Sequence, residues 1–304
     1  MVSLYIINKI YSNLLYFFLR KKPGYIIIGK APKNNEFLFD FSDKNNMHLG
    51  DSLFFIPLIK LFIKNNYRFK IIAYNNIKEL YHCYGIPSDY FDIPHLFKPN
   101  ILVSNWGSRK PSKNKYSLEI YINATDSKIS LNIGSFIVGI FADIFQDPSL
   151  FLPVNYIIKP NKSNLSSDIM YNYVIVSDEV SSGKFRVTNS MKFKLYNYAD
   201  KLRANSGARL VHTGLKVADF SFNKFIDFEL GSNLSVIDLV NLINSDRCIG
   251  VISFDTLTAH VACLASVPSY ILLKKRVFRH NSEFIKKFLF PIIPHANLKL
   301  INFI

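Results

Sequence analysis

Cysteine is scarce in this chain of 304 residues, which has only three, Cys83, Cys248 and Cys263. No two of them form a CxxC pair, and an odd number cannot pair completely. Both facts argue against a disulfide framework and against a zinc site. We therefore expect a protein of the reducing cytoplasm.

Glycine, proline and charged residues are also limited. The 12 glycines and 13 prolines are too few for a fibrous or linker-like chain, and 49% hydrophobic against 19% charged residues excludes a disordered one. No repeat of about 20 to 50 residues indicates a solenoid. The chain should be globular, and its length predicts two domains.

Acidic residues are outnumbered, with 22 Asp and Glu against 37 Lys and Arg, a formal net charge of +15. Such a charge attracts nucleic acids or anionic membranes. No helix-turn-helix, zinc-finger or RNP-like pattern accompanies the basic residues, so we expect no nucleic-acid partner. The expected partner is therefore the anionic inner leaflet of the cytoplasmic membrane.

A long uninterrupted apolar run is missing at the N-terminus. Residues 1–22 are broken by Asn8 and Lys9, end in a basic triplet, and lack the order of a signal peptide, so they are unsuited to span a membrane. They predict an amphipathic helix. It lies either at a membrane interface or packed on its own domain.

What the chain does contain is an alternation of short β-branched or aromatic runs with segments of helical period, which is typical of βαβ units around parallel sheets. We expect an α/β protein of two Rossmann-like domains, residues 23–150 and 169–304, joined by a Pro-rich linker over 151–168 and facing each other across a cleft. The expected strands are 25–28, 37–41, 69–73, 101–104, 173–177, 209–213, 248–253 and 270–273, and the expected helices are 52–64, 76–83, 134–145, 190–205, 235–244 and 256–265.

The segment from Asp255 to His260 is the most informative. A buried strand runs into Asp255 and Thr256, and a helix follows that carries Thr258 and His260. Free backbone N–H groups, two hydroxyls and an imidazole at one helix entrance suit a phosphate or pyrophosphate. The same residues are also those of an ordinary helix cap, and the spacing alone leaves both interpretations open.

This segment resembles the donor site of glycosyltransferase family 9, the bacterial lipopolysaccharide heptosyltransferases, in which the usual order is Asp-Ser/Thr-Gly-x-x-His. Asp255, Thr256 and His260 match that order, and Leu257 stands where the family has glycine. The resemblance implies that these residues bind the diphosphate of a nucleotide-sugar. Because glycine permits close backbone approach to phosphate, Leu257 is the point of departure.

A second match lies in the first half, where His48-Leu49-Gly50-Asp51 precedes an apolar helix carrying Pro57-Leu58. It resembles the Gly-Asp motif of the family, whose aspartate is the proposed general base. Gly50 is expected to let the loop after strand 37–41 turn tightly, with Asp51 at a helix start facing the cleft. Without the resemblance, Asp51 would be interpreted as a helix N-cap.

A third match is Lys184, in the loop after strand 173–177, which resembles a family lysine that contacts donor phosphate. A cation there would offset charge on the leaving diphosphate. The Trp-Pro that usually follows is absent, so Arg186 or Lys192 are alternatives, as is a solvated lysine without a role. His212 and Ser235 are expected to be structural, Ser235 as a helix cap.

The resemblance implies a GT-B-type glycosyltransferase that is inverting, metal-independent and free of a cofactor, with an ADP-sugar as the expected donor and a lipopolysaccharide or other cell-surface glycan as acceptor. We expect it in the bacterial cytoplasm, peripheral on the inner face of the membrane. A sugar-nucleotide epimerase or hydrolase on the same fold is the enzymatic alternative. A catalytically silent, membrane-peripheral nucleotide-sugar-binding protein is the other.

Overall fold

The chain divides into two compact units, and each is described by itself. Unit 1 comprises Met1–His82 with Ile86–Pro153, and unit 2 comprises Cys83–Gly85 with Val154–Ile304. The computed structural model describes residues 25–45, 47–105, 115–122, 137–138, 141–142, 144–150, 160, 169–179, 187–214, 220–230, 234–254, 256–265, 267–274 and 299–303. The helix expected over residues 1–22 lies outside these residues, as does the expected linker apart from residue 160. The domain boundaries and the cleft stay predictions.

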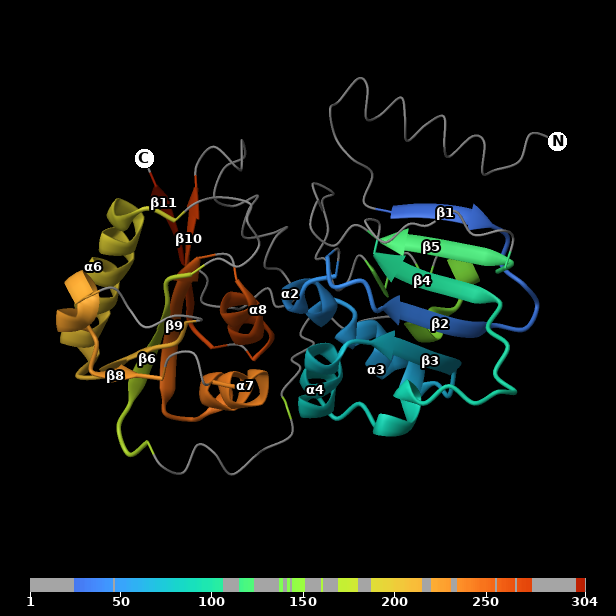
Figure 1. Cartoon of the computed structure of the whole chain (residues 1–304), viewed down its shortest axis with the longest axis horizontal. Helices are drawn as coiled ribbons and strands as arrows, with labels where there is room; N and C mark the ends of the chain where they lie inside the picture. Colours follow the sequence, from blue (N-terminus) through green and yellow to red (C-terminus); the bar gives the residue numbers. More distant parts are fainter. Residues whose placement is uncertain are drawn as a thin grey trace, which may run out of the picture. The chain divides into compact units, whose positions relative to one another are not determined.

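Unit 1 is built on a five-stranded sheet in the order β1-β5-β4-β2-β3 (Figure 1). The strands β2 to β5 are parallel, whereas β1 pairs with β5 in the antiparallel direction. The sheet is therefore mainly parallel, as expected, with one antiparallel strand at its edge. The bounds are Tyr25–Gly29 for β1, Glu36–Phe41 for β2, Arg68–Ala73 for β3, Ile101–Asn105 for β4 and Leu118–Ile122 for β5.

The helix expected over residues 52–64 is two helices, α2 (Leu49–Leu53) and α3 (Ile56–Lys64). Pro57 lies in the first turn of α3 and explains the break. A proline in mid-helix lacks an N–H donor and its ring clashes with the carbonyl four residues earlier, here that of Leu53, so the helix must restart. Further short elements are α4 (Asn75–Cys83), whose last residue is grouped with unit 2, and the 3₁₀ turns η1 (Ser88–Phe91) and η3 (Pro148–Leu150).

Aromatic rings form the core of unit 1. Phe37, Phe39 and Phe41 alternate along β2 and are fully buried, because successive strand side chains point to opposite faces. On this face the ring of Phe37 lies 4.7 Å from that of Phe62 on α3, and the Phe141 ring contacts both. This packing holds α3 under the strand that leads into α2.

Unit 2 is built on a six-stranded sheet in the order β11-β10-β9-β6-β7-β8, in which every pairing is parallel. The bounds are Tyr173–Ser177 for β6, Arg209–His212 for β7, Phe228–Glu229 for β8, Cys248–Phe254 for β9, Ser269–Lys274 for β10 and Lys299–Phe303 for β11. Expected strands correspond to β6, β7, β9 and β10, whereas β5, β8 and β11 were not predicted.

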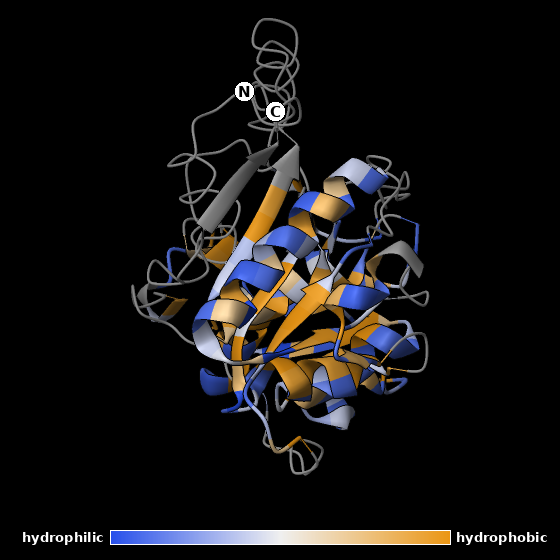
Figure 2. Ribbon diagram, turned by 90° about the vertical axis from the view of Figure 1, so that its left-hand side faces the viewer, coloured by the Kyte–Doolittle hydropathy of each residue, from blue (hydrophilic) through white to orange (hydrophobic). Residues whose placement is uncertain are grey.

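Helices cover both faces of this sheet, with α6 (Asn189–Ser206) on one face and α7 (Val236–Asn244) and α8 (Leu257–Leu264) on the other (Figure 1). A 3₁₀ turn, η5 (Phe220–Phe225), precedes β8. Figure 2 shows hydrophilic and hydrophobic bands alternating on the front helix, with mostly hydrophobic strands behind it. The expected cap is confirmed at Ser235, which forms a capping box with Asp238 at the start of α7.

Both units are thus α/β layers around parallel or mainly parallel sheets, so the expected fold class is confirmed. Among the residues that the structure describes, no helix is long and apolar enough to cross a membrane.

Candidate functional site

The strand order of unit 1 contains a topological switch point. From β2 the chain moves to β3 on one side and then crosses to β4 on the other, so connections diverge at the carboxyl ends of β2 and β4. There Asp40 lies opposite Ser104, whose Oγ donates to the Asp40 carbonyl at 2.8 Å. Such divergence creates the crevice in which α/β proteins bind ligands.

Asp51 lies in the segment that follows β2 at this edge. It is in the first turn of α2, as expected, and is 9% exposed. Gly50 is the second residue of α2, so the tight loop turn expected of it was wrong; the left-handed glycines of the described chain are elsewhere. His48 precedes the helix and makes no side-chain cap hydrogen bond. The motif is therefore a helix start with a buried carboxylate.

Two tyrosines contact the backbone on either side of this motif. The Tyr74 hydroxyl donates to the Met47 carbonyl at 3.1 Å, and the Tyr81 hydroxyl donates to the Ser52 carbonyl at 2.8 Å. Burial, and secondly the charge of Asp51, raise the pKa of Tyr74 to about 12. Tyr74 thus lies within electrostatic reach of the candidate base.

Unit 2 has its own switch point, between β6 and β9. From β6 the chain moves outward to β7 and β8, then crosses back to β9 and continues to β10 and β11. At the carboxyl ends, Ser177 of β6 pairs in register with Ser253 of β9, and both are buried. Thr213, after β7, is 3% exposed, and its Oγ has no hydrogen-bond partner among the described residues. Hydroxyl groups therefore gather at the edge where a ligand is expected.

The helix α8 begins at this edge, directly after Thr256. The Thr256 Oγ is buried and has no hydrogen-bond partner in the described part of the chain. His260 is half-buried, one turn into the helix, whereas Thr258 is 4% exposed. Asp255 lies outside the described residues. The entrance offers the first N–H groups of the helix, which have no acceptor within the helix itself, and the Thr256 hydroxyl, which is the chemistry that anions bind.

Leu257 is the first residue of α8 and is half-buried. Positive φ angles occur at two non-glycine residues of the described chain, Asn66 and Gln146, so the Leu257 backbone does not need the left-handed conformation that favours glycine. Leucine is therefore compatible with the backbone here. Only a ligand that must approach within van der Waals distance of its Cβ would call for glycine.

A buried charged network, which we call the Asp178 network, lies at the carboxyl ends of β6 and β7. His212 contacts two carboxylates, with Nε2 3.0 Å from Asp178 Oδ1 and Nδ1 2.6 Å from Glu229 Oε1. Asp178 Oδ2 accepts from Lys192 at 2.8 Å and from the Tyr196 hydroxyl at 3.2 Å. The side chains of His212 and Asp178 are 0% and 1% exposed. No sequence spacing signalled this network.

With both carboxylates ionised, this geometry makes His212 an imidazolium. A carboxylate only accepts hydrogen bonds, so both ring nitrogens must donate, which is possible only for the imidazolium. Burial alone lowers the pKa of His212, but its bonds to Asp178 and Glu229 outweigh burial and raise that pKa. Burial likewise raises the pKa of Asp178, and the bonds from His212 and Lys192 outweigh it and lower the pKa.

The network changes the interpretation of the candidate cations. Lys192, the alternative cation, is ion-paired with Asp178 and its side chain is only 18% exposed, so its charge is already matched within unit 2. Lys184 and Arg186 lie outside the described residues. His212 is structural, as expected.

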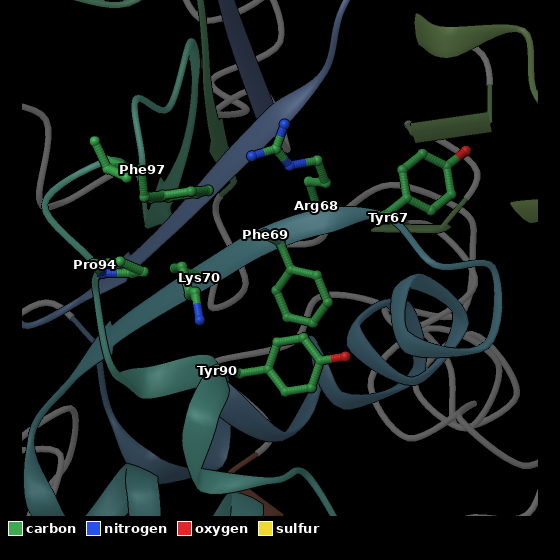
Figure 3. Close-up of a pocket in the computed structure, with 8 residues that line it drawn as sticks. Tyr67, Arg68, Phe69, Lys70, Tyr90, Pro94 and Phe97 are labelled. Carbon is green, nitrogen blue, oxygen red and sulfur yellow. The ribbon is translucent and has the colours of Figure 1, made fainter.

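Apart from these two edges, the structure has a shallow hollow of about 270 Å³ beside β3 (Figure 3). Phe69 and Tyr90 stack in it with ring centroids 4.4 Å apart, and Arg68 and Lys70 border it. It lies at the amino end of β3, opposite the carboxyl edge that carries Asp51, so it is not part of the candidate site. Within the described residues, no group of three or more His, Cys, Asp or Glu side chains is arranged to hold a metal ion.

Comparisons with known proteins place this geometry in context. No protein-family model matches the chain, and no curated protein matches it in sequence. Among solved structures, it is similar to a family 9 glycosyl transferase from Veillonella parvula DSM 2008, with a TM-score of 0.56 and 11% identity over 88% of this chain and 86% of that one.

Two E. coli enzymes are similar at the same identity of 11% and the same coverage of 88% of this chain. The heptosyltransferase WaaC, solved with ADP, has a TM-score of 0.53 and is covered over 93% of its length. The ADP-heptose lps heptosyltransferase II has a TM-score of 0.51 and is covered over 91%. At this identity the likeness establishes the fold, and the fold that the sequence motifs implied is confirmed.

Proposed function

We propose that this protein is a glycosyltransferase of the heptosyltransferase type, which transfers a sugar from a nucleotide-sugar to a lipopolysaccharide or other cell-surface glycan. One observation carries the proposal. In a chain with the fold of family 9 glycosyltransferases, Asp51 and the entrance of α8 each lie at the carboxyl edge of their own sheet, beside its switch point. Ligands of α/β proteins bind at such edges.

In the proposed reaction, Asp51 is the general base. Its carboxylate takes the proton of the acceptor hydroxyl as that oxygen forms a bond to the anomeric carbon. The bond from the anomeric carbon to the diphosphate oxygen breaks, and the nucleoside diphosphate leaves with the electron pair. A single displacement of this kind inverts the anomeric centre. Because Asp51 is 9% exposed, little water competes for its proton-accepting oxygen.

The departing diphosphate gains negative charge, and unit 2 would stabilise it. The N–H groups at the start of α8 and the free Thr256 hydroxyl can donate to phosphate oxygens. Thr258, His260, Asp255 and Lys184 belong to the proposed donor site, with Lys184 as the cation. The proposal includes no metal ion and no cofactor, and an ADP-sugar is the proposed donor.

The acceptor is proposed to be a glycan or glycolipid at the inner face of the cytoplasmic membrane. The net charge of +15 supports this, because an anionic leaflet attracts Lys and Arg through its surface potential. Residues 1–22 are the proposed additional contact.

A thermal-shift series with ADP-, UDP-, GDP- and CMP-sugars tests donor binding, because a ligand that binds the folded state raises its melting temperature. Product analysis with the best donor and an acceptor glycan then tests transfer. A sugar product that forms without acceptor would indicate an epimerase or hydrolase instead. Binding with no turnover of any kind would indicate a silent binding protein.

Replacing Asp51 with Asn tests the base. We expect kcat to fall by about 10² to 10⁴-fold, the usual contribution of general base catalysis, with donor affinity unchanged. Asp89→Asn is the matched control, because Asp89 is an exposed carboxylate of the same unit on η1. Retained turnover in the Asp51 variant would remove this residue from the role of base.

A further inference from the structure

The candidate base motif is enclosed between two hydrogen bonds from one neighbouring element. Tyr74 directly precedes α4 and Tyr81 lies within it, seven residues later, so the two side chains project from the same side of the helix. Their hydroxyls donate to the carbonyls of Met47 and Ser52. These carbonyls flank the four residues from His48 to Asp51.

The helix that carries Asp51 needs such support. With five residues, α2 is far shorter than a helix that is stable on its own, and its capping residue makes no side-chain hydrogen bond. The Ser52 carbonyl accepts from the Phe55 N–H at 3.1 Å, and Tyr81 supplies a second donor. The position of α2 is therefore fixed largely by tertiary contacts.

Both tyrosines are themselves held in place. The Tyr81 ring is fully buried with its centroid 6.2 Å from that of Phe41, the last residue of β2. The Lys44 ammonium lies 5.6 Å from the centre of the Tyr74 ring and so ties the loop after β2 to the same side chain. Burial raises the pKa of both hydroxyls, so both remain protonated donors at neutral pH.

We propose that Tyr74 and Tyr81 are positioning residues for proton transfer, which hold the α2 backbone so that Asp51 keeps a fixed orientation toward the acceptor hydroxyl. This inference rests on the proposed function, in which Asp51 is the base. Each tyrosine acts through a backbone carbonyl, on opposite sides of the base.

The test uses Tyr74→Phe and Tyr81→Phe, which remove one hydroxyl each and keep the ring. Tyr173→Phe is the matched control, because the Tyr173 hydroxyl also donates to a buried backbone carbonyl, that of Leu242 at 2.8 Å, in unit 2. Hydrogen exchange of the amides of residues 49–55 reports whether α2 is loosened. Kinetics with nucleotide-sugar and acceptor report whether catalysis depends on it.

We expect faster exchange over residues 49–55 in both Tyr74→Phe and Tyr81→Phe and not in Tyr173→Phe. We also expect kcat to fall about 10- to 100-fold with donor KM unchanged, because small displacements of a catalytic group are costly and the donor site is in the other unit. Combining either variant with Asp51→Asn should produce no further loss, which a merely structural defect would not predict.

Unchanged exchange in the two variants would overturn the inference, as would faster exchange with normal kcat. A proportional loss of donor affinity would also overturn it, since that indicates general destabilisation. Inactivity of the wild-type chain toward every donor would instead overturn the proposed function and the catalytic part of the inference. The exchange measurement would then still report whether the tyrosines hold α2.

Discussion

Replacing His212 with Gln removes the central charge of the Asp178 network and should destabilise unit 2. Breaking a buried ion pair costs about 3–5 kcal/mol, because it leaves a buried charge without compensation. Asp178 keeps Lys192 and Tyr196 as donors, and the Glu229 side chain is 28% exposed and can be hydrated. We therefore expect a loss of unfolding free energy at the lower end of this range, about 3 kcal/mol. For a unit of this size, that loss lowers the melting temperature by about 6–12 °C.

The loss should also depend on pH in a defined direction. The pKa of His212 is raised in the folded state, so its stabilisation is complete below the unfolded pKa of about 6.5 and is lost as pH rises through the folded pKa. Above pH of about 6.5 the stability difference between wild type and His212→Gln should shrink by up to about 1.4 kcal/mol per pH unit. The two proteins should become more alike in mild alkali.

Urea unfolding at a series of pH values measures this difference, and hydrogen exchange of the β6 and β7 amides assigns it to unit 2. His82→Gln is the control. His82 is exposed on α4. Its Nδ1 lies 2.9 Å from the Ile86 carbonyl and its ring contacts that of Phe91, so its loss should cost about 1 kcal/mol. A stability difference for His212→Gln that is equal at pH 5.5 and 8.5 would refute the charged imidazole.

Three further substitutions test the backbone and the donor site. Gly29→Ala should lose well over about 1 kcal/mol in urea unfolding, because φ is +100° and the new Cβ would lie 2.1 Å from the Ser117 carbonyl oxygen. Gly207→Ala, with φ +65° and no atom within 4 Å of the Cβ, should cost only about 1 kcal/mol; equal losses would contradict the steric explanation. Leu257→Gly should tighten nucleotide-sugar binding measured by calorimetry, and it should destabilise α8 by up to about 1 kcal/mol. Unchanged affinity would show that the leucine side chain does not obstruct the phosphate.

Much of the fold could be predicted because most strands are short runs dominated by apolar residues. Tyr173–Ser177 and Ile101–Asn105 are buried at every position and stand out in the sequence. The missed strand Leu118–Ile122 contains Glu119, which breaks the run although it is buried. The Tyr121 hydroxyl donates to it at 2.8 Å, a partner that a pattern of hydrophobic residues does not reveal. Strand β8, which was also not predicted, has only two residues.

The candidate site could be predicted in part. Gly50-Asp51 and Thr256 belong to short motifs of neighbouring residues, which can be recognised from the sequence alone. The tyrosine contacts that position Asp51 cannot be recognised in this way, and neither can the Asp178 network. His212 is 34 residues from Asp178 and 17 from Glu229, and only the parallel pairing of β6, β7 and β8 brings them together.

The Asp178 network bears directly on how unit 2 could accept a diphosphate. A lone carboxylate at the carboxyl edge of β6 would repel a phosphate bound at the β6–β9 switch point. Here the charges of His212 and Lys192 balance those of Asp178 and Glu229, so the network as a whole is neutral. Within the network, Lys192 is already ion-paired with Asp178. Lys184, the residue that the resemblance implies, therefore stays the proposed cation for the leaving group.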